Sequence, residues 1–221
     1  MPMATKRIPH DTPTRKALTK SFIENVVFAQ YRQLTGWQKV TGQSAQLDSG
    51  YLAQHLVSLI SGVPGSGIRG RGDDLVDGSE IKAASTIGAR DTPRWNHASF
   101  GQAKNVEKFL ANPYIYFVLF DTAERDSEVP LRIRVWRVAP QRDAAFVQVV
   151  RGWQATTKSG NFQLHPPLWE PGSLATNNAG NLRLPLIFEA VQREIEGVDF
   201  MDIDTWNPYA GRSKGVARDA G

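Results

Sequence analysis

The sequence predicts a single α/β domain with a central mixed β-sheet flanked by helices. Two segments near the N-terminus have the apolar spacing of amphipathic helices, and two segments in the middle of the chain have the composition of β-strands. The length of 221 residues suits one large domain, and 41% hydrophobic with 22% charged residues is ordinary for a globular protein.

The two N-terminal helices are expected on one side of the sheet. The first covers residues 14–34, and Gly36 is expected to end it. The second covers residues 51–60, and either Asp48 or Ser49 is placed to cap it.

Two segments in the middle of the chain read as strands. Residues 114–120 are almost wholly apolar, which predicts a buried central strand. Residues 131–138 alternate instead, which predicts a half-exposed strand with Arg132 and Arg134 on its outer face. The remaining expected elements are helices over 99–110 and 141–153, then a strand end and a final amphipathic helix over 184–196.

Catalytic chemistry is expected in one short polar run in the first half of the chain. Asp77-Gly78 is a strong signal for a hairpin turn between short extended segments. Side chains alternate along a strand, so Glu80 and Lys82 point to one face while Ile81 points toward the core. Carboxylate oxygens suit a hard cation such as Mg²⁺, and a lysine beside it can orient or deprotonate a water. These are components of metal-assisted phosphodiester hydrolysis.

The length of the turn decides which aspartate shares the face of Glu80. A two-residue loop pairs Asp73 with Lys82, whereas a three-residue loop pairs Asp74 with Lys82. The turn signal is compatible with both loops, so both aspartates remain candidates.

The run from Asp73 to Lys82 resembles the PD-(D/E)xK nuclease superfamily, in which an Asp, an apolar strand and a turn precede Glu-hydrophobic-Lys. The resemblance implies that Asp74 (or Asp73), Glu80 and the backbone carbonyl of Ile81 bind Mg²⁺, and that Lys82 positions the attacking water. It favours Asp74, because that residue directly precedes an apolar pair. The proline of the superfamily name is absent here.

A longer pattern adds Asn161-Phe-Gln-Leu-His-Pro-Pro167 far downstream and resembles type II restriction endonucleases, including those of the MamI kind. This resemblance implies a restriction-endonuclease-like core and Mg²⁺-dependent cleavage of double-stranded DNA at a specific sequence. It also implies a homodimer, since protein symmetry mirrors the symmetry of a palindromic site.

Polar side chains outside the motif are expected to contact DNA. Residues from about 154 to 185 are expected to carry much of the sequence readout, because Asn, Gln, Arg and Lys read base edges. The competing interpretation is an ordinary surface loop. The expected DNA contacts are Arg69, Arg71, Arg94, Asn96, His97, Lys158, Asn161, Gln163 and His165.

The net charge of +4 is concentrated at the two ends of the chain. Residues 1–20 carry a net +4 and residues 205–221 a net +2, so the remainder carries −2. The expected organisation is a flexible N-terminal arm over 1–13, a nuclease domain over 14–204 and a basic C-terminal tail over 205–221. Such ends either contact phosphates or serve as solubilising tails.

Several other functions fit the sequence poorly. The chain has no cysteine, and its four histidines lack the paired spacing of a zinc site. The Gly-x-Ser-x-Gly elbow of serine hydrolases is absent. A cytoplasmic protein without membrane contact is expected, because neither a long apolar run nor a secretory signal occurs.

Two alternatives to a restriction enzyme stay open. One is a repair or recombination nuclease of the same superfamily that reads DNA structure instead of sequence. The other is a non-catalytic DNA-binding module in which residues 73–82 form a solvated hairpin.

Overall fold

The computed structural model describes residues 8–67, 73–88, 93–98, 100–123, 129–156, 160–167 and 184–210. A five-stranded sheet with the strand order β1-β3-β4-β6-β7 lies at its centre. β1 is parallel to β3, and the other neighbouring pairs are antiparallel, so the predicted mixed α/β class is confirmed. The strands are β1 (Glu80–Ser85), β3 (Ile115–Thr122), β4 (Leu131–Val138), β6 (Leu186–Ile195) and β7 (Val198–Trp206).

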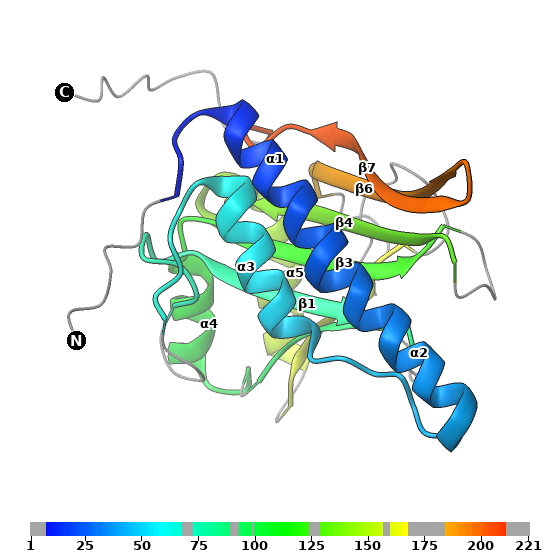
Figure 1. Cartoon of the computed structure of the whole chain (residues 1–221). Helices are drawn as coiled ribbons and strands as arrows, with labels where there is room; N and C mark the ends of the chain where they lie inside the picture. Colours follow the sequence, from blue (N-terminus) through cyan, green and yellow to red (C-terminus); the bar gives the residue numbers. More distant parts are fainter. Residues whose placement is uncertain are drawn as a thin grey trace, which may run out of the picture.

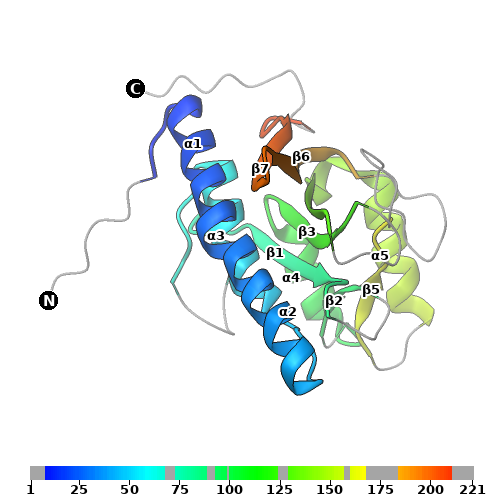
Figure 2. The ribbon, with the colours of Figure 1, turned by 45° about the vertical axis from the view of Figure 1, so that its right-hand side comes forward.

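Helices cover both faces of this sheet, as Figures 1 and 2 show from two directions. One face carries α1 (Thr12–Phe22), the π-helical segment η1 (Ile23–Phe28), α2 (Ala29–Thr41) and α3 (Ser49–Ser61). The other face carries α4 (Ala103–Ala111), the short 3-10 helix η2 (Pro140–Arg142), α5 (Ala144–Thr156) and a two-stranded sheet of β2 (Trp95–His97) and β5 (Phe162–Leu164).

Each face of the sheet has its own hydrophobic cluster. The cluster under α1 and α3 includes Ile81, and the cluster under α4 and α5 includes Ala84. Because β1 alternates between these clusters, the position of every side chain along it is set by burial on both sides.

The first helical segment is longer than predicted. It runs without interruption from α1 to the end of α2 at Thr41, with Gly36 inside it. Gly42 ends it in the left-handed conformation at φ 71°. A glycine inside a helix costs only about 0.5–1 kcal/mol, which does not terminate a segment of this length.

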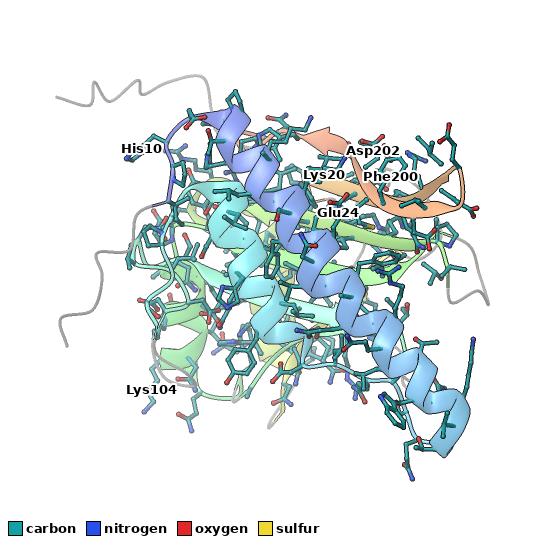
Figure 3. All side chains as sticks on the ribbon, viewed as in Figure 1. His10, Lys20, Glu24, Lys104, Phe200 and Asp202 are labelled. Carbon is teal, nitrogen blue, oxygen red and sulfur yellow. The ribbon has the colours of Figure 1, made fainter. Side chains whose placement is uncertain are left out.

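The start of this segment also lies inside the expected N-terminal arm, and the last two residues of β7, Thr205 and Trp206, lie inside the expected C-terminal tail. Residues 1–7 and 211–221 lie outside the described part of the chain. Near the two ends, Lys20 of α1 lies 3.9 Å from Glu24 and 5.2 Å from the ring centre of Phe200 in β7 (Figure 3). This contact joins the first helix to the last strand.

The prediction of a half-exposed β4 is wrong. Every residue of this strand is buried. Asp121 of β3 accepts hydrogen bonds from Arg132 Nε at 3.0 Å and from Arg134 Nη2 at 2.8 Å. Paired charges are tolerated in an interior, so the basic positions face inward instead of outward.

The prediction of a final amphipathic helix is also wrong, because this part of the chain forms the β6–β7 hairpin. Its two-residue loop, Glu196-Gly197, has φ 52° and 76°. Positive φ at both loop residues is the geometry of the hairpin turns that match strand twist.

The helices predicted over 99–110 and 141–153 are present as α4 and α5, with boundaries shifted by a few residues. Among the described residues, no helix combines the length and hydropathy needed to cross a bilayer.

Candidate active site

The segment before β1 is a tight turn and not one arm of a hairpin. The N–H of Leu75 donates to the carbonyl of Ser79 at 3.1 Å, and the N–H of Gly78 donates to the carbonyl of Leu75 at 3.1 Å. Leu75 forms an isolated bridge with Gly65, while β1 pairs with β3. The predicted hairpin is therefore wrong, and neither predicted register occurs. The turn at Gly78 is real, with φ at 85°.

Glu80 and Lys82 lie on the same face of β1, as the alternation predicts. Lys82 Nζ donates a hydrogen bond to Glu80 Oε1. Both side chains line a pocket of about 350 Å³ whose other wall comes from β2 and α4. The complete lining is Asp73, Glu80, Lys82, Asn96, His97, Ala98, Lys108, Phe109 and Asn112.

The two aspartates face different surroundings. Asp73 lines the pocket, and its carboxylate lies 3.6 Å from Lys108 Nζ. Asp74 Oδ2 accepts a hydrogen bond from the N–H of Ile81 at 2.8 Å, and its Oδ1 accepts one from Gln54 Nε2 of α3 at 2.6 Å. Asp73 is thus the aspartate on the pocket wall, and Asp74 is held at the edge of β1.

The backbone of β1 directs the carbonyl of Ile81 toward Asp74. The N–H of Glu80 donates to Tyr114 beside β3, so the next residue points to the open edge of the sheet. The N–H and the carbonyl of one strand residue lie on the same side. The carbonyl of Ile81 therefore faces the edge where Asp74 lies.

Two side chains in the pocket have displaced pKa values. Burial raises the pKa of Glu80; Lys82 opposes this rise, and the charges of Asp74 and Asp73 add to it. Burial and, to a smaller extent, the nearby ammonium groups of Lys82 and Lys108 together lower the pKa of His97 to about 4. His97 is therefore neutral near pH 7, and it stacks on Phe109 with ring centres 4.6 Å apart.

A family model of the MamI restriction endonuclease matches residues 36–201, which is well over half of the chain. The chain belongs to the MamI restriction endonuclease family. It is 39% identical to the type II restriction enzyme MamI of Microbacterium ammoniaphilum over 178 residues, which cover 73% of this chain and 58% of that relative. This chain thus spans just over half of the relative's length. No solved structure is significantly similar to it.

The family match includes every residue that lines the pocket. The resemblance to restriction endonucleases inferred from the sequence is thereby confirmed at the level of the MamI family. The assignment of individual residues within the pocket stays a prediction.

The expected DNA contacts of this MamI-family chain are only partly brought together. Asn96 and His97 line the pocket, and the pairing of β2 with β5 places Gln163 opposite Asn96. His165 Nδ1 lies 3.2 Å from the carbonyl of Pro93, which joins the end of β5 to the start of β2. Of the other expected contacts, Arg94 is exposed, Asn161 is half-buried, and Arg69, Arg71 and Lys158 lie outside the described residues.

The sequence pattern did not predict a role for three polar residues in or next to the pocket: Lys108, Asn112 and Gln54. The sequence pattern predicts a solvent-exposed position for Lys108 on its helix. Gln54 lies on a helix that is distant from the motif in the sequence. The spacing within one segment carries no signal for contacts between α3, α4 and β1.

The donors around Glu80 fit a hard cation. Among the described residues, no group of three or more His, Asp or Glu side chains converges as a metal cluster. Mg²⁺ does not require one, because it usually takes one or two carboxylates and keeps several waters. Glu80, one of the two aspartates and the carbonyl of Ile81 are oxygen donors of the required kind.

Proposed function

We propose that this chain is a Mg²⁺-dependent type II restriction endonuclease that hydrolyses phosphodiester bonds of double-stranded DNA at a specific sequence. The observation that carries the proposal is the pocket at the start of β1. Asp73, Glu80 and Lys82 all line this pocket, and the chain belongs to the MamI family.

The cation would be held by Glu80, the carbonyl of Ile81 and either Asp74 or Asp73. When bound, Mg²⁺ supplies Lewis acidity at the scissile phosphate and offsets the negative charge of the transition state. The hydrogen bonds that Asp74 accepts from Ile81 and Gln54 favour it as an oriented ligand. The position of Asp73 in the pocket supports a contact that is direct or mediated by water.

Lys82 is proposed to align the attacking water. Its ammonium group is held by Glu80 on the pocket wall, with 18% of the side chain exposed. Each ammonium has three donors, so one donor can engage Glu80 while another holds a water for in-line attack. Lys82 also keeps Glu80 more acidic than burial alone would allow.

The second wall of the pocket is proposed to face DNA. Asn96 and Gln163 lie opposite each other on the small sheet, and both are amides of the kind that reads adenine. His97 is neutral there, so it can exchange hydrogen bonds with DNA without adding charge.

We also propose a homodimer, because a two-fold axis in the protein matches a palindromic recognition site. Sedimentation of the purified chain with and without duplex DNA tests this point. A monomer in both conditions would contradict it.

The function is tested by digesting plasmid and phage DNA with the purified chain in Mg²⁺, beside EDTA and beside Lys82→Ala. We expect discrete bands in Mg²⁺, none in EDTA, and a rate at least about 100-fold lower for Lys82→Ala, the usual scale for a proton-transfer group. Lys104→Ala serves as the matched control, since Lys104 is exposed at the start of α4, at the lower end of this helix in Figure 3, and does not line the pocket.

Other results would point to the other functions. A Mg²⁺-dependent smear or nick would favour a nuclease that reads DNA structure. Intact DNA in every condition, with salt-sensitive binding, would leave a non-catalytic binding module.

A further inference from the structure

The carboxylates on the pocket wall are paired with lysines from two different elements. Glu80 is paired with Lys82 of the same strand, and Asp73 with Lys108 of α4. The pairs differ in tightness: Lys108 Nζ lies 3.6 Å from Asp73, and its side chain is 64% exposed. Lys82 is hydrogen-bonded and mostly buried.

We propose that Lys108 is a DNA-phosphate contact which the divalent cation releases from Asp73. The proposal rests on the function proposed above and adds a residue to it. Lys108 is exchanged between two anions: the carboxylate of Asp73 in the free protein, and a phosphate next to the pocket once the cation is bound.

The weakness of the Asp73–Lys108 pair makes the exchange feasible. The pair is longer than a normal hydrogen bond, and both side chains are substantially exposed, with 41% of the Asp73 side chain open to solvent. Exposed pairs of this kind hold their partners only loosely. A second anion therefore competes with Asp73 on favourable terms.

A divalent cation changes the charge balance around Lys108. Without the cation, the pocket lining carries two carboxylates, Asp73 and Glu80, and two ammonium groups, Lys82 and Lys108. Their formal charges sum to zero. A cation at Glu80 adds two positive charges to the same pocket, whether it meets Asp73 directly or through a water. The attraction of Asp73 for Lys108 is then offset, and a phosphate becomes the stronger partner.

The surroundings leave Lys108 free to turn. The adjacent wall is packed: His97 stacks on Phe109 at 4.6 Å and meets Phe100 edge-on at 5.2 Å. His97 is neutral and lies within the field of both Lys82 and Lys108. The long, exposed side chain of Lys108 is therefore the part of this wall that can follow a phosphate.

The test measures binding of a labelled 30-base-pair duplex of arbitrary sequence over a range of salt concentrations, with Ca²⁺ and with EDTA. Ca²⁺ shares the oxygen preference of Mg²⁺, and gels run beside each titration confirm that the duplex stays intact. The slope of log K against log salt is negative, and each lost phosphate contact reduces its magnitude by about 0.9. We expect Lys108→Ala to reduce the magnitude of the slope by about 0.9 in Ca²⁺ and to leave it unchanged in EDTA.

Lys104→Ala is the matched control, because it removes the same charge one turn earlier in α4 and lies outside the pocket lining. Any loss of slope in this variant should be the same with and without Ca²⁺. A second variant, Asp73→Asn, frees Lys108 without a cation. It should increase the magnitude of the slope in EDTA by about 0.9, and adding Lys108→Ala to it should remove that increase.

The proposal is overturned if Lys108→Ala matches the wild type in both conditions, or if it loses the same slope in both. A parallel digest in Mg²⁺ separates this failure from failure of the proposed function. If the wild type cuts DNA but the effect of Lys108→Ala on the slope is the same in Ca²⁺ and in EDTA, the proposed exchange is wrong and the proposed function stands. If no DNA is cut, the function itself fails.

Discussion

At the scale of single residues, Glu80 is held between opposing effects. Burial and the two neighbouring aspartates raise its pKa, and Lys82 lowers it. A carboxylate must lose its proton to bind a cation. If Glu80 binds the cation as proposed, the affinity is expected to be full above the pKa of Glu80 and to fall as the pH drops through that value.

Lys82→Met should move this loss to a higher pH, because it removes the ammonium group that lowers the pKa of Glu80. The measurement is Mn²⁺ binding by calorimetry between pH 5 and 8, with the midpoint of the pH dependence as the readout. Lys104→Met, which changes an exposed lysine, should leave the midpoint unchanged. An unshifted midpoint in Lys82→Met would show that Glu80 does not control cation binding.

At the scale of secondary-structure elements, one side chain connects α3 to the turn before β1. Gln54 Nε2 donates to Asp74 Oδ1 at 2.6 Å, and Asp74 in turn accepts from the N–H of Ile81 in β1. The helix thus orients a carboxylate that belongs to a turn. Partners that orient a metal ligand typically change metal affinity 10–100-fold.

Gln54→Ala should weaken Mn²⁺ binding by about 10-fold or more, since Asp74 loses its contact with α3. His55→Ala, at the adjacent exposed position of the same helix, is the control for nonspecific effects on α3. Calorimetric binding curves and thermal melts of both variants provide the comparison. Equal Mn²⁺ affinity in Gln54→Ala and the wild type would exclude an orienting role.

A buried charge cluster links β3 to β4 beside their backbone pairing. Asp121, Arg132 and Arg134 are almost fully buried and hydrogen-bonded to one another through Asp121. Removing one member of such a cluster leaves uncompensated charge in the interior. The cluster therefore links the stability of the sheet to one carboxylate.

Asp121→Asn should lower the free energy of unfolding by about 3–5 kcal/mol. Asp204→Asn removes a carboxylate from an exposed pair with Arg193 and should cost less than about 1 kcal/mol. Urea denaturation followed by circular dichroism measures both variants. Similar losses in the two variants would contradict the role assigned to burial.

At the scale of the whole molecule, the two-sided sheet determines where the pocket can form. β1 is one of the two edge strands of the five-stranded sheet, so its start is open on one side while α3 and α4 approach it from opposite faces. Figure 2 shows α3 and α4 on the two sides of β1. The turn before β1, the second wall of the pocket and α3 come from segments far apart in the chain.

Local patterns by themselves determined much of this protein. The apolar run of β3, the turn at Gly78 and the shared face of Glu80 and Lys82 follow from periodicity and backbone preference, which act over a few residues. The resemblance to restriction endonucleases also came from the local motif, and the MamI family match confirms it.

Only the tertiary structure decided how distant segments meet. It placed Asp73 in the pocket and Asp74 at the edge, brought Lys108 to the opposite wall, and buried the arginines of β4 against Asp121. The alternation in β4 correctly predicted a strand. Whether its arginines are exposed or buried, however, depended on Asp121 in β3. The physical reason is that pairing and burial depend on contacts between elements, and the period of one segment does not specify its neighbours.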